Sequence, residues 1–167
     1  MSRQDKDDTR RTLELYVLRA GGRLFAIRAA EVEATAEGLT ATPLPRAPEA
    51  VVGVVSLRGR VRTALNPLRL VAARDETDAA RAADAHADKR PAPRFFVALK
   101  GDDQLALACD GAEAVIEVAS QELTPTADAQ SPALGTFTHG GLNVTLLDAA
   151  RLFDAAMQGT DRRRRRS

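Results

Sequence analysis

Residues 43–61 read PLPRAPEAVVGVVSLRGRV, and this stretch decides the fold. Its three prolines exclude a long helix at the start. The β-branched run from Val51 to Leu57 then predicts a strand, the pair Arg58-Gly59 a tight turn, and Arg60 to Leu65 a returning strand. We therefore expect a proline loop that leads into a β-hairpin.

Three further segments have the same hairpin signature, two apolar runs around a glycine-containing turn. They turn at Gly21-Gly22, at Gly101-Asp102 and at Gly140-Gly141. Asn66-Pro67 and Asp148 follow the second and fourth hairpins as helix caps. The sequence thus predicts a mainly β protein with short helices and a C-terminal amphipathic helix.

The second half of the chain weakly repeats the first. Phe25-Ala26-Ile27 matches Leu105-Ala106-Leu107 when the halves are offset by 80 residues, and Asn66 matches Asp148 at an offset of 82. Both halves have the order hairpin, helical turn, proline loop, hairpin and capped helix. Because lobes of well under ~80 residues are marginal alone, we expect two five-stranded subdomains that share one hydrophobic core.

The expected domain organisation follows from this repeat. A single domain covers residues 13–157, with subdomains at approximately 13–72 and 94–157 and a charged linker at 73–93. Residues 1–12 and the arginine-rich tail 158–167 are expected to be disordered.

The composition and the N-terminal sequence indicate the cellular compartment in which the protein is found. The formal net charge of +1 gives no global field to attract nucleic acid or an anionic membrane. The N-terminus lacks the apolar stretch of a signal peptide, and no run approaches the ~18 apolar residues of a membrane span. The only cysteine, Cys109, follows apolar neighbours and predicts a buried thiol in a reducing compartment. We expect a cytoplasmic protein.

Side chains that carry chemistry are sparse. His86 lies in the charged linker and His139 beside a glycine turn, and a nucleophilic pair of Cys109 with His139 is disfavoured because the cysteine lies in an apolar strand. Asp102-Asp103 reads as a solvated turn rather than a metal pair. We expect no enzyme, no cofactor and no metal site.

The arginine run Arg162 to Arg166 is the one candidate for binding nucleic acid or an anionic membrane. The alternative is a solvated tail enriched by base composition, which we favour. Aromatic residues make up only 4% of the chain and tryptophan is missing, which argues against stacking on single-stranded nucleic acid.

Four segments together resemble one known family, the CheW-like domain. They are Leu15 to Ile27, Pro43 to Val61, Leu107 to Val118 and Gly141 to Phe153. The family has a proline loop, an apolar strand that ends in Asn-Leu-Arg-Gly, and a strand leading to Val-Asp-Leu-Arg. The resemblance runs from Leu13 to about Ala156.

The resemblance implies two SH3-like five-stranded β-barrel subdomains that share a core. It also implies a non-catalytic adaptor with two partners, the cytoplasmic tip of a methyl-accepting chemoreceptor and the regulatory domain of a CheA-type histidine kinase. The protein-binding residues expected from it are Val32, Ala34, Ser56, Leu57, Arg58, Gly59, Arg60 and Arg62.

The chain departs from the family pattern at this site. Ser56 stands for the motif asparagine, Ala34 for a glutamate that pairs with the motif arginine, and Thr63 and Asn66 for the usual proline and aspartate. Arg58 therefore loses its usual partner. A chain that keeps only one of the two partners is the alternative function.

Two features near these departures leave alternatives open. Glu33 or Glu37 is a substitute partner for Arg58, although strand alternation turns a neighbouring residue the other way. Arg58, Arg60 and Arg62 are spaced by two, which places them on one face of the hairpin. That face is either a basic docking surface or a solvated strand face, and we favour the solvated face.

Overall fold

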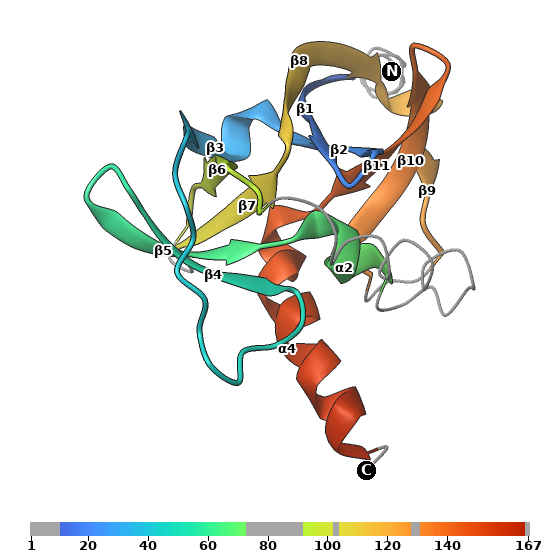
Figure 1. Ribbon diagram of the computed structural model, residues 1–167. Helices are drawn as coiled ribbons and strands as arrows, with labels where there is room; N and C mark the ends of the chain where they lie inside the picture. The colour runs from blue at the N-terminus through green and yellow to red at the C-terminus, as the bar shows by residue number, and fades with distance from the viewer. Residues whose placement is uncertain (1–10, 73–91, 102–103, 128–130, 166–167) are drawn as a thin grey trace.

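The computed structural model describes residues 11–72, 92–101, 104–127 and 131–165 (Figure 1). Most of the expected linker 73–93 and of the expected disordered residues 1–12 lies outside the described residues. The elements in chain order are β1 (Thr12–Ala20), β2 (Arg23–Arg28), η1 (Ala29–Glu31), β3 (Val32–Glu37), β4 (Val51–Leu57), β5 (Arg60–Leu65), α2 (Pro67–Ala72), β6 (Phe95–Leu99), β7 (Leu105–Cys109), β8 (Gly111–Ala119), η2 (Ser120–Glu122), β9 (Thr124–Pro125), β10 (Ala133–His139), β11 (Leu142–Leu147) and α4 (Ala149–Arg165).

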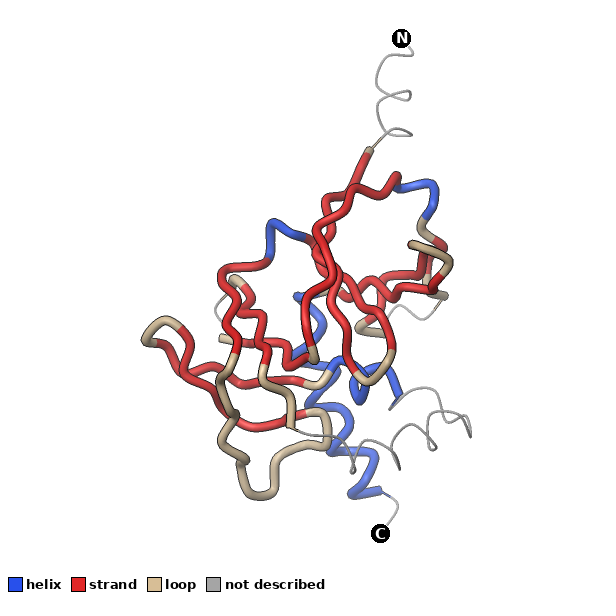
Figure 2. The backbone as a smooth tube through the Cα atoms, turned by 45° about the horizontal axis from the view of Figure 1, so that its top comes forward, coloured by secondary structure: helices blue, strands red, loops and turns tan. Residues whose placement is uncertain are grey.

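The strands form two sheets, and Figure 2 shows each of them strongly curled. The six-stranded sheet has the order β8-β1-β2-β11-β10-β9, and the five-stranded sheet has the order β3-β6-β7-β5-β4. Neighbours are antiparallel except at two places, where β2 runs parallel to β11 and β7 runs parallel to β5. The expected mainly β fold with short helices and a C-terminal helix is confirmed, but only one of the two sheets has the expected five strands, because the short strand β9 adds a sixth to the other.

The two sheets do not coincide with the two halves of the sequence. The hairpin β1–β2 of the first half lies in one sheet with β8, β10 and β11 of the second, and the hairpin β6–β7 lies in the other sheet with β3, β4 and β5. The halves thus exchange hairpins reciprocally. Each sheet therefore contains strands from both of the expected subdomains, 13–72 and 94–157. The repeat is still present, because the two halves contribute equivalent hairpins to the two sheets.

Alternate residues of the central strands are buried in different cores, and one of these cores joins the two halves of the chain. On β7 the larger residues Leu105, Leu107 and Cys109 join a core shared by strands of both sheets and by both α-helices. The alternate residues Ala106 and Ala108 join a separate core within the five-stranded sheet. The six-stranded sheet has its own core. The central core is thus shared, as expected from lobes too small to be stable alone.

The helix caps form as the sequence predicts. Leu68 N–H donates to Asn66 Oδ1 at 3.0 Å, and Ala150 N–H donates to Asp148 Oδ1 at 3.0 Å. Helix α4 continues to Arg165, so most of the tail expected to be disordered over 158–167 is helical in its backbone. In Figure 1 this helix extends away from the sheets. Among the described residues, no helix is long and apolar enough to cross a membrane.

Candidate protein-binding site

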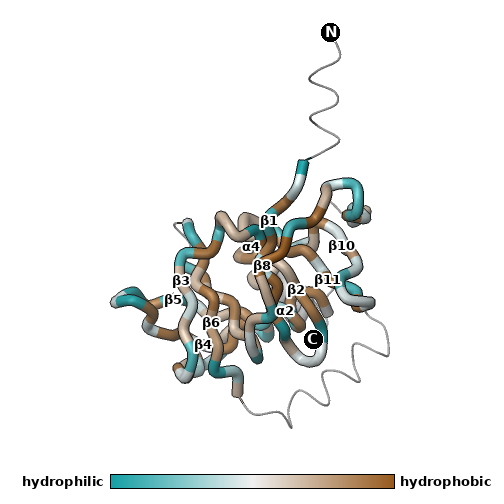
Figure 3. The backbone as a smooth tube through the Cα atoms, turned by 90° about the horizontal axis from the view of Figure 1, so that it is seen from above, coloured by the Kyte–Doolittle hydropathy of each residue, from teal (hydrophilic) through white to brown (hydrophobic). Residues whose placement is uncertain are grey.

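The tip of the hairpin β4–β5 is a two-residue turn. Leu57 pairs with Arg60 across the last rung, which leaves Arg58 and Gly59 as the turn, with φ of 53° and 78°. Positive φ at both positions is the geometry of a type I′ turn, whose twist matches the flanking strands. The tip projects from the body in Figure 1 and is hydrophilic in Figure 3.

The structure places the eight predicted site residues at three levels of burial. Ser56, Arg58, Gly59 and Arg60 are exposed at the tip. Three others are buried: Ala34, Leu57 and Arg62 are 8%, 3% and 3% exposed. Val32 is half-buried and packs against the shared core.

Leu57 and Ala34 meet inside the five-stranded sheet. Both belong to the core cluster that also contains Phe96 and Val55. Leu57 therefore anchors the hairpin beneath its own tip instead of presenting a contact surface. Ala34 lies opposite Ala98 in the pairing of β3 with β6, so an apolar side chain occupies the position at which the family has a glutamate.

Arg62 is held inside the curled sheet by two polar contacts. Its Nη1 donates to the carbonyl oxygen of Leu99 at 2.9 Å, and its Nη2 lies 2.5 Å from Glu33 Oε2. These partners belong to β6 and β3, two strands that are not adjacent to β5 in the sheet order. The arginine side chain thus ties three strands together across the interior.

The prediction of a solvated face for Arg58, Arg60 and Arg62 is wrong for Arg62. Arg60 and Arg62 do share a face by alternation, but that face also carries Leu57 and turns into the core of the sheet. Arg60 remains exposed to solvent because it lies next to the turn, beyond the edge of this core. The substitute partner Glu33 pairs with Arg62 and not with Arg58.

A β-bulge explains why Glu33, itself exposed, lies beside the buried Arg62. The pairing of β3 with β6 slips by one residue between Val32 and Ala34, so Glu33 has no opposite residue. An extra residue of this kind changes the direction of the side chain, which simple alternation would turn outward. Sequence reasoning had considered Glu33 but had no signal for the bulge.

The electrostatics around the tip are dominated by cations. The pKa of Glu33 is lowered by the hydrogen bond from Arg62 and further by the charges of Arg62, Arg60 and Lys100. Glu33 is therefore held ionised and is already paired. Within the described part of the chain, Arg58 and Arg60 have no ion-pair partner.

Val61 is a surface residue that sequence reasoning missed. Its side chain is 61% exposed and lies opposite Ser56, on the face of the hairpin that points away from the core. The exposed tip therefore combines an apolar side chain with two unpaired guanidinium groups. A β-branched residue next to the turn was a possible signal, but it reads equally well as an ordinary strand residue.

Groups that could support other chemistry lie elsewhere or are inert. Cys109 is 1% exposed, and burial raises the pKa of its thiol to about 12, with the charge of Asp110 adding to the shift. In the ranges that the structure describes, no group of three or more His, Cys, Asp or Glu side chains could hold a metal ion.

Comparisons with known proteins concern the family and the fold. The family model for the CheW-like domain matches residues 14–157. Curated protein sequences give no significant match. Among solved structures, the chain is similar to the scaffolding protein TtCheW from Thermoanaerobacter tengcongensis, with a TM-score of 0.64 and 14% identity over 86% of this chain and 94% of the other.

Proposed function

The chain belongs to the CheW-like domain family, and from this premise we propose that it couples a chemoreceptor to a CheA-type histidine kinase. CheW-like domains are non-catalytic scaffolds of chemotaxis signalling, and the chain is accordingly an adaptor domain rather than an enzyme. The two partners proposed are the cytoplasmic tip of a methyl-accepting chemoreceptor and the regulatory domain of the kinase.

The observation that carries the proposal is the β4–β5 tip. It retains the Leu-Arg-Gly of the family motif at Leu57, Arg58 and Gly59, and the structure presents Arg58 to solvent on a turn whose base is fixed by buried Leu57. Because the two-residue turn fixes the backbone of Arg58, binding need order only the arginine side chain and not the loop. A surface of this kind favours an acidic or polar partner segment with a small apolar contact for Val61.

The altered ion pair favours one alternative, a chain that keeps only one partner. Arg58 lacks the glutamate that the family places at Ala34, and the charge of Glu33 is used by Arg62 instead. The contact surface next to the turn thus differs from the family pattern on the side of β3. Loss of one partner would follow if that partner contacts the carboxylate.

Binary binding separates these functions. Isothermal titration of the chain with a receptor cytoplasmic fragment, and separately with a kinase regulatory domain, should give two complexes if the chain is a coupling adaptor. One complex only would establish the alternative. Failure of both would overturn the coupling proposal.

Charge reversal then tests the tip itself. We expect Arg60→Glu and Arg58→Glu each to weaken the complex made by the tip about tenfold or more, the scale of a central interface residue. Arg58→Asn removes the charge but suits positive φ, which separates charge from backbone strain. Arg23→Glu is the matched control, since Arg23 is exposed directly after the glycine turn of β1–β2 as Arg60 is after Gly59.

A further inference from the structure

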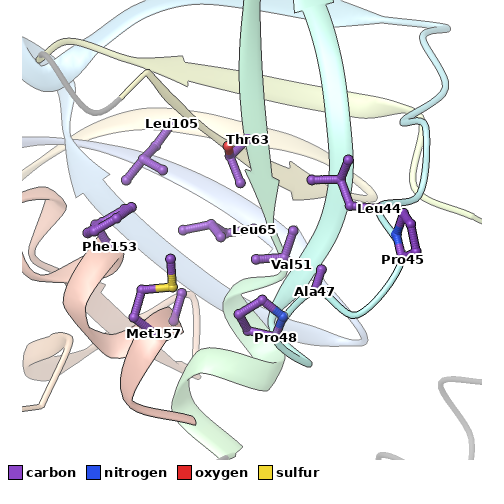
Figure 4. Close-up of a pocket in the computed structure, with 11 residues that line it drawn as sticks. Leu44, Pro45, Ala47, Pro48, Val51, Thr63, Leu65, Leu105, Phe153 and Met157 are labelled. Carbon is purple, nitrogen blue, oxygen red and sulfur yellow. The ribbon is translucent and has the colours of Figure 1, made fainter. Parts of the chain in front are cut away.

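Strand β5 carries different side chains on its two faces. On one face, Thr63 and Leu65 line an apolar pocket together with residues of the proline loop and of helix α4 (Figure 4). On the other face, alternation places Arg60 and Arg62, and Arg62 is buried inside the curled five-stranded sheet. The charge that β5 brings to the β4–β5 tip therefore comes from its arginine face.

Glu33 is the carboxylate that Arg62 neutralises. Its Oε2 lies 2.5 Å from Arg62 Nη2, and the side chain of Glu33 is 39% exposed while that of Arg62 is 3% exposed. The ion pair thus has an exposed negative end and a buried positive end. The charge of Arg60 also contributes to the lowered pKa of Glu33, so the carboxylate lies within electrostatic reach of the tip.

Arg62 is only partly satisfied where it is buried. Its Nη1 donates to the carbonyl oxygen of Leu99 and its Nη2 to Glu33, but its Nε has no hydrogen-bond partner in the described part of the chain. A buried N–H group without an acceptor costs free energy. Arginine is thus a costly way to fill this position, and its distinct contribution is a positive charge beside Glu33.

The two tip cations are unpaired while Glu33 is paired elsewhere. Arg58 and Arg60 are exposed, and among the described residues neither has an ion-pair partner. Arg60 precedes Arg62 by two residues on the same face, which is about 7 Å along a strand. With a neutral residue at position 62, the charge of Glu33 would offset that of Arg60. With Arg62 present, the ion pair is neutral and the tip has both positive charges.

We propose that Arg62 keeps the β4–β5 tip cationic by neutralising Glu33, and that the tip thereby selects a protein surface that carries carboxylates. Arg62 is a positioning residue, because it acts through Glu33 and is itself buried. Exposed Val61 next to Arg60 favours a protein over nucleic acid, which is bound through many phosphate contacts. The inference rests on the coupling function proposed above and deepens it, since it names the residue that sets the charge of the partner.

The charge of the tip can be measured without a partner. Two nitroxides, anionic 3-carboxy-PROXYL and cationic 3-aminomethyl-PROXYL, enhance the relaxation of amide protons in proportion to their local concentrations. In the full chain, the anionic probe should have the larger effect on the amide protons from Arg58 to Val61. The ratio of the two effects should fall about twofold in Arg62→Met and return to the wild-type value in Arg62→Met/Glu33→Gln, because the second change removes the released carboxylate.

A matched control comes from the other sheet. Arg19 pairs with Glu113 at 2.6 Å on the six-stranded sheet, so Arg19→Met also releases a carboxylate. This variant should leave the ratio at the tip unchanged. Asp102 and Asp103 lie outside the described residues, and because every variant retains them, the comparison between variants removes their contribution.

A second neutral variant guards against loss of the fold. Arg62→Gln removes the same charge but keeps an amide that can donate to the carbonyl of Leu99, and should lower the ratio as Arg62→Met does. Glu33→Gln alone should raise the ratio, since it leaves the charge of Arg62 uncompensated. Circular dichroism spectra and unfolding midpoints verify that each variant is folded.

Partner binding tests the selection of carboxylates. Isothermal titration uses the receptor cytoplasmic fragment or the kinase regulatory domain, whichever forms the complex that Arg58→Asn weakens. We expect its Kd to rise about threefold or more between about 50 and about 200 mM salt, as for an electrostatic contact. Arg62→Met should weaken this complex about threefold, and Arg62→Met/Glu33→Gln should restore it.

The outcomes separate this inference from the coupling function. If neither domain binds the wild-type chain, coupling and partner selection fail together, whereas the nitroxide ratio still decides the role of Arg62. An unchanged ratio in folded Arg62→Met and Arg62→Gln, or a lowered ratio that Glu33→Gln does not restore, would overturn that role. A complex that is insensitive to salt, or binding of duplex DNA that Arg60→Glu abolishes, would overturn the selection of an acidic protein surface.

Discussion

Glu33 and Glu113 occupy equivalent positions in the two halves of the chain, and each is the unopposed residue of a β-bulge. Glu113 interrupts the pairing of β8 with β1 as Glu33 interrupts that of β3 with β6. Each carboxylate pairs with an arginine, Glu113 with Arg19 at 2.6 Å and Glu33 with Arg62 at 2.5 Å. The pairs differ in burial, since the side chain of Arg19 is 52% exposed and that of Arg62 only 3%.

This difference predicts that Arg62 and Arg19 contribute unequally to stability. Arg62→Ala removes a packed side chain and leaves the carbonyl of Leu99 without its partner, and should lower the free energy of unfolding by about 2–3 kcal/mol. Arg19→Ala should cost at most about 1 kcal/mol, as for an exposed ion pair. Urea unfolding followed by circular dichroism measures both.

Arg62→Met extends the test to the nature of the contact. Methionine restores much of the packing but leaves the Leu99 carbonyl and Glu33 without Arg62, so we expect a loss of about 1–2 kcal/mol, between wild type and the alanine variant. A methionine variant as unstable as the alanine variant would show that the polar contacts, rather than the packing, hold the three strands together.

The lowered pKa of Glu33 predicts a pH dependence. Its hydrogen bond from Arg62 and the charges of Arg62, Arg60 and Lys100 favour the ionised form in the folded chain. The stabilisation is therefore complete above the ordinary glutamate pKa of 4.5 and is lost as the pH falls below it through the folded pKa.

Thermal unfolding of wild type and Glu33→Gln between pH 7 and pH 3 measures this effect. The difference in Tm between the two chains should be constant above about pH 5 and shrink below pH 4.5. Glu37→Gln, an exposed position at the end of the same strand, is the matched control. A difference that stays constant down to pH 3 would show that ionisation of Glu33 does not contribute.

The sequence predicts the local elements well because hairpins and caps are encoded by neighbouring residues. The Arg58-Gly59 turn and the Asn66 and Asp148 caps are present where the residue types predict them. Pairing between hairpins is different. Since the two halves are similar, β1–β2 has comparable apolar faces to offer to either half, and only the packing of the whole chain selects the exchanged arrangement.

The candidate site shows the same limit in its side chains. Alternation correctly places Arg60 and Arg62 on one face, but an arginine on a strand near a turn gives no sign that the strand curls around it. The bulge at Glu33 was also hidden, since it depends on the register with β6, a strand more than 50 residues away in the sequence. Leu57 and Ala34 are buried because the five-stranded sheet curls around its own core.

Gly53 and Gly135 are another pair of equivalent positions in the two halves, and at each of them a neighbouring backbone segment lies too close to leave room for a side chain. A Cβ on Gly53 would meet the carbonyl oxygen of Thr42 at a sub-contact distance, and one on Gly135 would meet that of Thr124. Gly53→Ala and Gly135→Ala should each destabilise by about 2–3 kcal/mol, because a backbone atom has to move. Gly111→Ala is the control, since open space surrounds its Cβ, and an equal loss there would exclude the steric explanation.

The burial of Cys109 predicts that the thiol is protected in the folded state. Its side chain belongs to the shared core, and burial raises its pKa to about 12, so almost no thiolate forms at pH 8. We expect Ellman's reagent to react with the native chain at least about a hundredfold more slowly than with the chain in urea, at the rate at which the core opens. Because the core contains residues of both sheets and both α-helices, we expect global unfolding rather than a local fluctuation to expose Cys109. Substitutions that destabilise the fold, such as Gly53→Ala, should therefore raise the labelling rate in proportion to the unfolded fraction. Rapid labelling that is insensitive to Gly53→Ala would instead place the cysteine in a locally mobile strand.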